Sequence, residues 1–440
     1  MNRFFIKTSI VILFTMISGS IWGQTDSLVK TKDSLSLQQA IKIVLNNYPS
    51  VKQAESAIDI ADARIGLAKT GYYPDIDFTG SYTRIGPVPT IDFPGLGAFQ
   101  LATKDNLNAS INVRQTIWDF GKTAKDVNYE TQNKEIAKQS VEQLKQNLTY
   151  SVIRVYYSMV YLQEAIQIKE DQIKNLKQHL DFVQKKKNTG SATEYEILST
   201  QVKLSNAESQ KTDMETAKEV QSTKLNSLLG NNPSSHLTVK NDIKVVSPSE
   251  TIDSMLIIAF TNRDEIKIAN QKVTLADLRY QSIKSSTNPT LNFLASAGYK
   301  NGYVPDLNDL KANFVVGLGV KIPIFDANRK KFNLKQVTAF KQSSLYDIEV
   351  SKRNIANEVI EDNAQLNADR KKIKQNQIQV DLATKALSIA QVNFKEGAIT
   401  NIDLLDATTN LSESKLLLLK SRIDFLVNIY TLKLSMGERL

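Results

Sequence analysis

The sequence contains no cysteine and only two histidines in 440 residues. Without cysteine there is no disulfide, no thiol nucleophile, no cysteine-ligated metal and no lipid-modified N-terminal cysteine. A metal cluster with a histidine ligand, or a serine–histidine pair, would have to use His179 or His236. We expect both imidazoles to lie on solvated surface, and we predict no metal site and no cofactor.

Long apolar runs are also absent after the N-terminus. The chain opens with Arg3 and Lys7, continues with the apolar segment 10–17 and then reaches the small residues 18–20. This order is typical of a secretory signal peptide, because the apolar segment is far shorter than the roughly 20 residues of a spanning helix. We therefore predict a signal peptide over 1–23 and an exported mature chain.

Positive charge is present but dispersed. The net charge is +9 at pH 7, and the tightest basic run, 185–187, lies beside a predicted helix end. Cations at that end complement the helix dipole. No aromatic residues are interleaved with these lysines, as they are on nucleic-acid-binding surfaces. The composition thus predicts no nucleic-acid partner.

Proline and glycine are missing from two stretches of nearly equal length. We predict long helices over 121–187 and 328–395, each followed by a glycine-containing turn and a second helix, over 193–229 and 400–436. A helix of 67 residues would reach about 100 Å and needs partners along its length. Heptad spacing predicts coiled-coil partners. One heptad series of the first long helix holds Val141, Leu148, Val155, Leu162, Leu176 and Val183, with Lys169 as its sole exception.

The chain is an internal tandem duplication. Segment 40–54 aligns with 255–269 at an offset of 215 residues, and 189–201 aligns with 396–408 at an offset of 207. We therefore divide the mature chain into a first repeat, 24–230, a linker, 231–250, and a second repeat, 251–440. Each repeat is predicted to run helix, strand, loop, strand, very long helix, turn and long helix.

Four segments alternate apolar and polar residues. They cover about 75–85, 107–116, 290–300 and 313–322, the length of transmembrane β-strands. A soluble sheet with one face on a core remains the alternative. In lipid, four strands could not stand alone, because their edges would leave backbone groups unpaired. Several chains would have to share one barrel. Two chains would give eight strands, and three would give twelve with room for a pore.

The loop 86–105 between the first two strands contains Pro87, Pro89, Pro94 and Gly95. A long loop at one end of a barrel and long helices at the other are the polarity of an outer-membrane barrel. We predict that this loop faces the exterior.

Together these residues resemble the TolC family of outer-membrane efflux ducts, over nearly the whole mature chain. The resemblance rests on the segments 35–51, 115–122 and 403–411, on the prolines before the strands, Pro74 and Pro289, and on the duplicated order. It implies an α+β membrane protein: a homotrimer with a twelve-stranded transmembrane β-barrel, four strands per chain, and a coiled-coil α-helical barrel across the periplasm. It also implies passive conduction, a periplasmic adaptor protein, an inner-membrane transporter, and a linker that forms part of an equatorial belt.

The resemblance places a periplasmic gate at Asp403 and Asp406. Thr400 is the expected N-cap of the last helix, and Asp403 stands at the capping-box position. The first repeat has Thr193 and Glu196 with the same spacing, but it has Ser199 where Asp406 stands. Asp403 is thus mostly explained by helix initiation, whereas Asp406 is specific to the second repeat.

Two further sets of residues follow from the resemblance. In some members of the family, polar residues at the positions of Phe394 and Ile399 help to latch the closed gate, so any closed state of this chain must be held differently, for example by apolar contacts. The hairpin tips, at Gly190, Thr193, Gly397 and Thr400, are the expected docking points of the adaptor.

Two other functions compete with a duct. The first is a periplasmic coiled-coil scaffold without a pore, which leaves the alternating strands unexplained. The second is an enzyme, such as a glycosidase, that uses Asp403 and Asp406 as its carboxylate pair. No His or Arg lies nearby in the sequence and no aromatic platform for a sugar is present, so we predict that the protein is not an enzyme.

Overall fold

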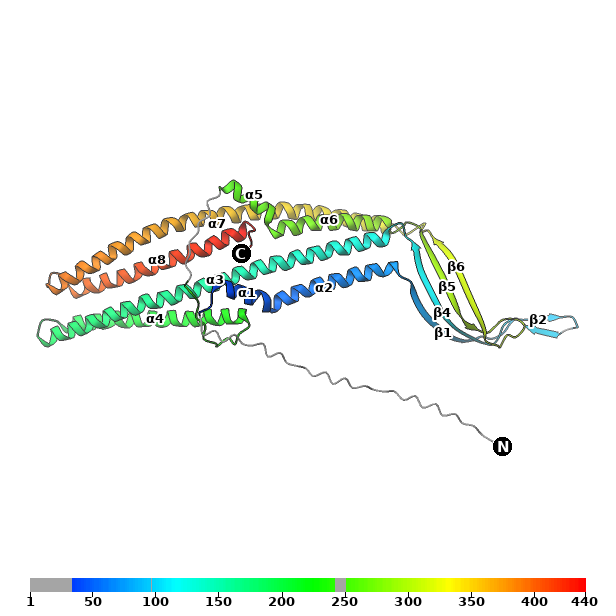
Figure 1. Cartoon of the computed structure of the whole chain (residues 1–440), viewed down its shortest axis with the longest axis horizontal. Helices are drawn as coiled ribbons and strands as arrows, with labels where there is room; N and C mark the ends of the chain where they lie inside the picture. Colours follow the sequence, from blue (N-terminus) through cyan, green and yellow to red (C-terminus); the bar gives the residue numbers. More distant parts are fainter. Residues whose placement is uncertain (1–33, 96, 242–250) are drawn as a thin grey trace, which may run out of the picture.

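The computed structural model describes residues 34–95, 97–241 and 251–440. The predicted signal peptide, 1–23, and residues 242–250 of the linker lie outside the described residues. The molecule is elongated, with paired helices along most of its length and a sheet at one end (Figure 1). The predicted fold class is confirmed for the single chain.

Each repeat is built on one helix of 67 residues. These are α3 (Lys122–Asn188) and α7 (Arg329–Lys395), and two shorter helices lie in line beside each of them (Figure 1). In the first repeat the shorter helices are α2 (Pro49–Lys69) and α4 (Glu194–Leu229), with α1 (Leu37–Asn47) before α2. In the second they are α6 (Asp264–Ser285) and α8 (Asn401–Ser435), with α5 (Ile252–Asn262) before α6.

The heptad pattern accounts for the packing of α3. Of the seven residues in the predicted series, all but Val155 are buried. Lys169, the apparent exception, is only 2 % exposed and donates a hydrogen bond to Gln172 Oε1 at 2.9 Å. Burial lowers the pKa of Lys169, and the carboxylate of Glu413 on α8 partly opposes this. The lysine therefore occupies a core position of the coiled coil, where burial opposes its charged form.

The strands form one antiparallel sheet in the order β1–β4–β5–β6. They are β1 (Asp75–Arg84), β4 (Asp105–Trp118), β5 (Thr290–Lys300) and β6 (Lys311–Lys321). The sheet joins the two repeats through the β4–β5 pair. Within the described helices, none combines the length and the apolar character needed to cross a membrane.

The strand register brings the apolar residues to one face. Phe78 lies opposite Ile111, Ile111 opposite Ala297, and Ala297 opposite Phe314. Phe78 and Phe314 are 71 % and 79 % exposed in the single chain. A strand slipped by one residue would turn every one of these side chains to the other face. The sheet therefore presents a broad apolar surface that no part of the described chain covers.

The opposite face of the sheet is polar. Arg114 lies 3.0 Å from Asp75 and 2.6 Å from Asp77, and Asn112 donates to Asp77 at 2.9 Å. Ser296 of β5 extends the network by donating to Asn112 at 2.9 Å. One face thus suits lipid, while the other suits water.

The predicted loop 86–105 contains more structure than expected. Residues Thr90–Phe93 (β2) and Gly97–Gln100 (β3) pair as a separate antiparallel hairpin that projects beyond the sheet (Figure 1). Pro87 and Pro89 precede it. Pro94 and Gly95 form its turn, where Gly95 has a φ of +84°.

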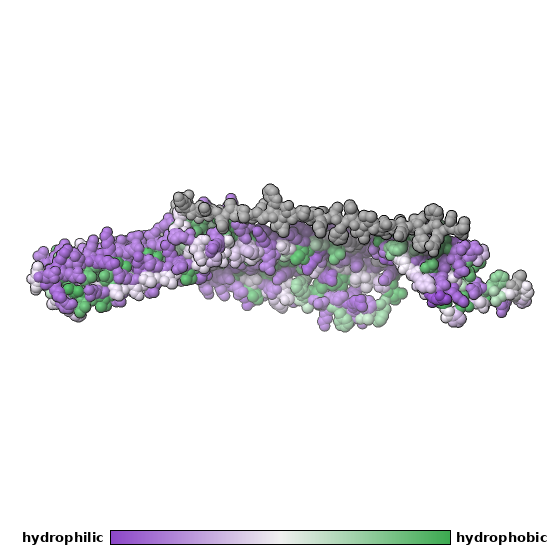
Figure 2. Space-filling model, turned by 90° about the horizontal axis from the view of Figure 1, so that it is seen from below, coloured by the Kyte–Doolittle hydropathy of each residue, from purple (hydrophilic) through white to green (hydrophobic). Residues whose placement is uncertain are grey.

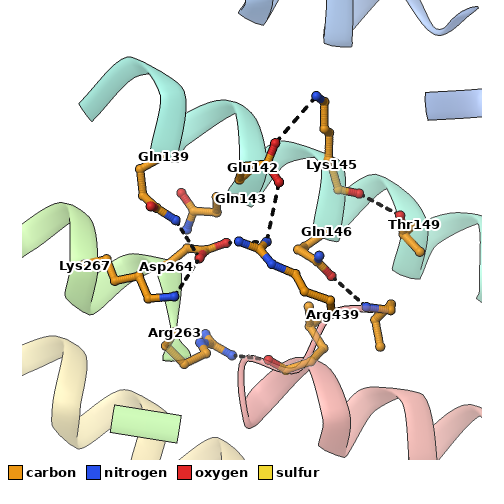
Figure 3. Close-up of polar contacts among 12 residues, drawn as sticks. Gln139, Glu142, Gln143, Lys145, Gln146, Thr149, Arg263, Asp264, Lys267 and Arg439 are labelled. Atoms are coloured by element: carbon orange, nitrogen blue, oxygen red, sulfur yellow. Dashed lines mark hydrogen bonds and ion pairs between the residues drawn. The ribbon is translucent and has the colours of Figure 1, made fainter. Parts of the chain in front are cut away.

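The two repeats meet midway along the molecule in a polar network around Asp264 (Figure 3). The side chain of Asp264 is 9 % exposed, and it accepts from Gln139 Nε2 at 2.7 Å and from Arg439 Nη1 at 3.2 Å. Beside it, Arg263 donates to Leu434 O at 3.2 Å. Desolvation raises the pKa of Asp264, although Arg439 opposes the shift. The network fastens the end of α8 to the start of α6 and to α3.

We expect Gly298→Ala to disrupt the sheet. A Cβ at Gly298 would lie 2.1 Å from the backbone oxygen of Ala109, which cannot move without breaking the β4–β5 pairing. Overpacking of this kind costs about 1–3 kcal/mol or more. Thermal unfolding in detergent, followed by circular dichroism, should show a clear loss of stability. Gly317→Ala on β6 is the control, because nothing lies within 4 Å of its added Cβ. Equal melting of the two variants would contradict the close approach.

We expect Arg439→Gln to destabilise the junction in a pH-dependent way. Without Arg439 the buried Asp264 carboxylate loses its hydrogen-bonded cation and keeps the more distant Lys267, whose Nζ lies 3.9 Å away, a loss of about 1–3 kcal/mol. The variant should lose the most folding stability relative to wild type at neutral pH, where the Asp264 carboxyl is ionised. This loss should shrink as the pH falls through the raised folded-state pKa of Asp264, because the protonated carboxyl no longer needs a cation.

The measurement is the melting temperature of wild type and variant between neutral and acidic pH. Arg422→Gln, at an exposed arginine of α8, is the control. Adding Asp264→Asn to Arg439→Gln should restore stability at neutral pH. A deficit that is constant with pH would show that Asp264 is not the group involved.

Candidate functional site at the hairpin tips

The helical end of the molecule consists of two helical hairpins, α3–α4 and α7–α8 (Figure 1). Gly190 and Gly397 follow the long helices with φ of +72° and +75°, the left-handed backbone that glycine adopts without strain. Thr193 and Thr400 then cap the next helices. Both capping boxes expected from the sequence are present, with Glu196 and with Asp403.

Asp403 serves its own helix. Its Oδ2 accepts from the backbone N–H of Thr400 at 2.9 Å and from the Thr400 hydroxyl at 2.6 Å. These hydrogen bonds, the hydroxyl first, lower the pKa of Asp403. The carboxyl is exposed, so it remains ionised and accessible while it caps α8.

Asp406 is bound to the other hairpin instead. Its Oδ1 accepts from Lys203 Nζ of α4 at 2.9 Å, and the two side chains are 54 % and 37 % exposed. An ion pair this open to solvent contributes less than about 1 kcal/mol. The pair therefore partly neutralises Asp406 without fixing it firmly.

Both aspartates open onto one groove. The groove has a volume of about 760 Å³ and runs between α7 and α8, with Ile378, Leu382 and Leu417 among its lining residues. Buried Leu404 and Leu405 lie between the two aspartates in sequence and face the protein interior. The α8 helix thus presents Asp403 and Asp406 on the surface that faces away from the core.

Phe394 and Ile399 lie where the two hairpins touch. Phe394 is 7 % exposed and belongs to an apolar cluster with residues from all four helices, and Ile399 packs against that cluster. The buried members besides Phe394 are Val183, Ile197, Leu387 and Leu404. Apolar packing therefore joins the hairpins at Phe394 and Ile399, the two positions where we expected the sequence to depart from a polar latch.

His179 was wrongly expected on solvated surface. It is half-buried on α3, and its Nε2 lies 2.6 Å from Asn401 Oδ1 on α8. Its ring meets Phe394 edge-on, with centroids 5.2 Å apart. Burial lowers the pKa of His179, which favours the neutral imidazole. Sequence reasoning also missed Asn401, because an asparagine after a capping threonine gives no sign of being buried.

The remaining predicted residues lie at the opposite end of the molecule. Pro87, Pro89, Pro94 and Gly95 belong to the β2–β3 hairpin and its approach, beyond the sheet (Figure 1). Among the residues that the structure describes, no group of three or more His, Asp or Glu side chains could hold a metal ion. On the face drawn in Figure 2, hydrophilic residues cover most of the helical end, and hydrophobic residues form separate patches.

Comparison with known proteins identifies the family. The family model described as outer membrane efflux protein matches residues 40–231 and 258–438. The outer membrane efflux protein BepC of Brucella suis biovar 1 is 22 % identical over 406 residues, 90 % of this chain and 84 % of BepC.

Two solved structures share the fold. The outer membrane protein VceC of Vibrio cholerae superposes with a TM-score of 0.75 at 17 % identity, over 91 % of this chain and 96 % of VceC. The MtrE outer membrane channel of Neisseria gonorrhoeae, in its open state, gives 0.74 at 16 % identity, over 92 % and 89 % of the two chains. The chain therefore belongs to the outer membrane efflux protein family, the family of TolC, and is an outer-membrane efflux channel.

Proposed function

We propose that three copies of this chain form a duct that conducts substrates passively from the periplasm, or from an inner-membrane pump, to the exterior. In this proposal Asp403 and Asp406 form the gate at the periplasmic end. The observation that supports the three-copy duct is the sheet, which has one exposed apolar face, one polar face and two open edges.

The unpaired edges of the sheet are the reason that we propose several copies of the chain. β1 and β6 each pair on one side only within the described chain. In lipid, every unpaired backbone group costs several kcal/mol, and only a closed ring of strands removes that cost. Three copies would give twelve strands, with room for a watery lumen lined by the polar face around Arg114 and Asn112. The apolar face would then meet lipid.

Helices on both sides of the chain carry exposed apolar side chains. α2 and α4 run along one side and α7 along the other (Figure 1). Large apolar side chains on both sides are exposed, and a neighbouring copy would bury them. On α2 and α4 they are Ile60, Leu67, Tyr195, Leu198, Val202 and Val220; on α7 they include Phe332, Tyr346, Val350, Leu382, Ile389 and Val392.

At the gate, three copies would place Asp403 and Asp406 in two stacked rings of carboxylates. Such rings attract cations and repel one another when the opening is narrow, which would raise the pKa of at least one carboxyl in the assembly. In the single chain Asp403 has the opposite shift, caused by Thr400. Lys203 would reduce the charge of the Asp406 ring.

The names of the relatives support the proposed partners. BepC is named an efflux protein, and AprF of Pseudomonas aeruginosa is named an alkaline protease secretion protein. We propose that this chain works in a tripartite efflux or type I secretion system with an inner-membrane transporter. A periplasmic adaptor would dock at the tips around Gly190, Thr193, Gly397 and Thr400. The β2–β3 hairpin would stand at the external mouth.

No catalytic role is proposed for the aspartate pair. The family consists of channels, Asp403 caps α8, and Asp406 is paired with Lys203.

The double variant Asp403→Ala/Asp406→Ala tests the gate in planar bilayers. Wild type should give discrete conductance steps with a preference for K⁺ over Cl⁻. A carboxylate and an ion about 4 Å apart in water interact by about 1 kcal/mol, so removing the rings should lower the permeability ratio by about fivefold. It should also raise or reshape the conductance.

The control is Asp213→Ala/Glu219→Ala, which removes the same charge from exposed positions of α4 away from the tips. An unchanged permeability ratio in the tip variant would refute the gate. A wild-type protein that is a soluble monomer and forms no pore would refute the duct itself.

A further inference from the structure

The side chain of Asn401, the first residue of α8, is buried against the α3–α4 hairpin, which the sequence did not indicate. Asn401 is 2 % exposed. Its Nδ2 lies 3.2 Å from Glu196 O, from Ser199 Oγ and from Thr200 Oγ1, all on α4. Its Oδ1 lies 2.6 Å from His179 Nε2 on α3. One amide therefore connects three helices.

The acceptors settle the orientation of this amide. The carbonyl of Glu196 can only accept, so the amide nitrogen of Asn401 must face α4 and its oxygen must face His179. His179 Nε2 then carries a hydrogen and donates it. Both groups at the centre of the contact are satisfied only while α8 stays against α3 and α4.

Aromatic rings close the contact from the side of α7. Phe394 meets the ring of His179 at 5.2 Å and that of Phe182 at 6.2 Å. Lys186 Nζ lies 5.2 Å from the centroid of Phe394 and 5.4 Å from that of Phe182. The hydrogen bond between His179 and Asn401 is thus held in a partly dry site, where its loss would not be fully compensated by water.

The position of Asn401 connects this contact to the gate. It follows the capping residue Thr400, and Asp403 and Asp406 come two and five residues later on the same helix. Within the described residues, the Asp403 carboxylate is held by Thr400 and that of Asp406 by the exposed pair with Lys203. Among the described side-chain hydrogen bonds and ion pairs of this helix turn, those of the Asn401 amide are the buried ones.

We propose that His179 and Asn401 are positioning residues that lock the first turn of α8, and with it Asp403 and Asp406, against the α3–α4 hairpin. This inference rests on the proposed function, since it assigns the lock to the proposed gate. Release of the lock would free the tip of the α7–α8 hairpin to move relative to the α3–α4 hairpin. The lock occupies other positions than Phe394 and Ile399, where the resemblance placed the latch.

Two histidine variants separate the hydrogen bond from the packing. His179→Phe keeps an aromatic ring against Phe394 but removes the donor. His179→Gln removes the ring but keeps an N–H that can reach Asn401. In planar bilayers, His179→Phe should raise the fraction of time in the high-conductance state about tenfold, equivalent to about 1.4 kcal/mol. His179→Gln should stay close to wild type.

Asn401→Leu provides an independent variant. It should open the pore at least as much as His179→Phe, and the double variant should add little, because both changes remove the same bond. His236→Phe, at the exposed second histidine, is the control. Thermal dissociation of each assembly in detergent would show whether a variant merely weakens the protein. If Asn401→Leu fails to assemble, the comparison of His179→Phe with His179→Gln still tests the lock.

The lock is refuted if His179→Phe leaves gating unchanged, or if His179→Gln opens the pore as much as His179→Phe. The two proposals fail in different ways. If wild type forms no pore, the proposed function fails and the lock with it. If Asp403→Ala/Asp406→Ala changes the pore but His179→Phe does not, the gate stands and the lock alone fails.

Discussion

An open sheet edge is the constraint on which the account depends. Backbone N–H and C=O groups at the outer sides of β1 and β6 have no partner within the described chain, and lipid offers none. The strand register has already turned apolar residues to one face and charged residues to the other. A sheet of this kind reaches a stable state in a membrane only by joining other copies. In the proposed trimer the helices would follow the same threefold rotation as the strands, and the exposed apolar side chains of α2, α4 and α7 would be buried between copies.

The duplication supplies the scaffold, and divergence between the copies supplies the residues to which we assign the proposed gate and lock. Both repeats end their long helix at a left-handed glycine and restart with a threonine cap and an acidic residue three positions on. Beyond these shared features the two sequences diverge at most positions, and two of the differences concern the tip. Asn401 and Asp406 stand where the first repeat has Glu194 and Ser199, at the offset of 207 residues. The buried contact and the charged surface of the tip both arise there.

Two polar contacts link α4 to α8, the Asn401 amide and the Lys203–Asp406 ion pair, and they differ in strength. Leaving a buried amide unsatisfied costs about 1–3 kcal/mol, whereas an exposed ion pair such as Lys203–Asp406 contributes less than about 1 kcal/mol. The uncharged contact at Asn401 is therefore the stronger candidate for holding the tip. In the proposed gate the exposed charge of Asp403 would act on ions, and that of Asp406 would do so to the extent that Lys203 leaves it unpaired.

Local periodicity predicted most of the fold. The long helix expected over 121–187 is α3 (Lys122–Asn188), and the strand expected over 290–300 is β5 (Thr290–Lys300). Strands β2 and β3, with four residues each, are too short to show a period. The contact between His179 and Asn401 joins residues 222 positions apart, so it depends on which helices pack together. No local pattern carries that information, and the same is true of the Asp264–Arg439 pair.

Closure of the barrel between copies is the central claim, and cross-linking tests it most directly. The chain has no cysteine, so introduced cysteine pairs report only the chosen contact. One cysteine in β1, within 75–84, and one in β6, within 311–321, should be scanned across registers in outer membranes. The account predicts that one register yields cross-linked dimers and trimers and nothing larger, since a ring of three has no free edge. Absence of cross-links at every register, or a ladder that continues beyond three copies, would contradict it.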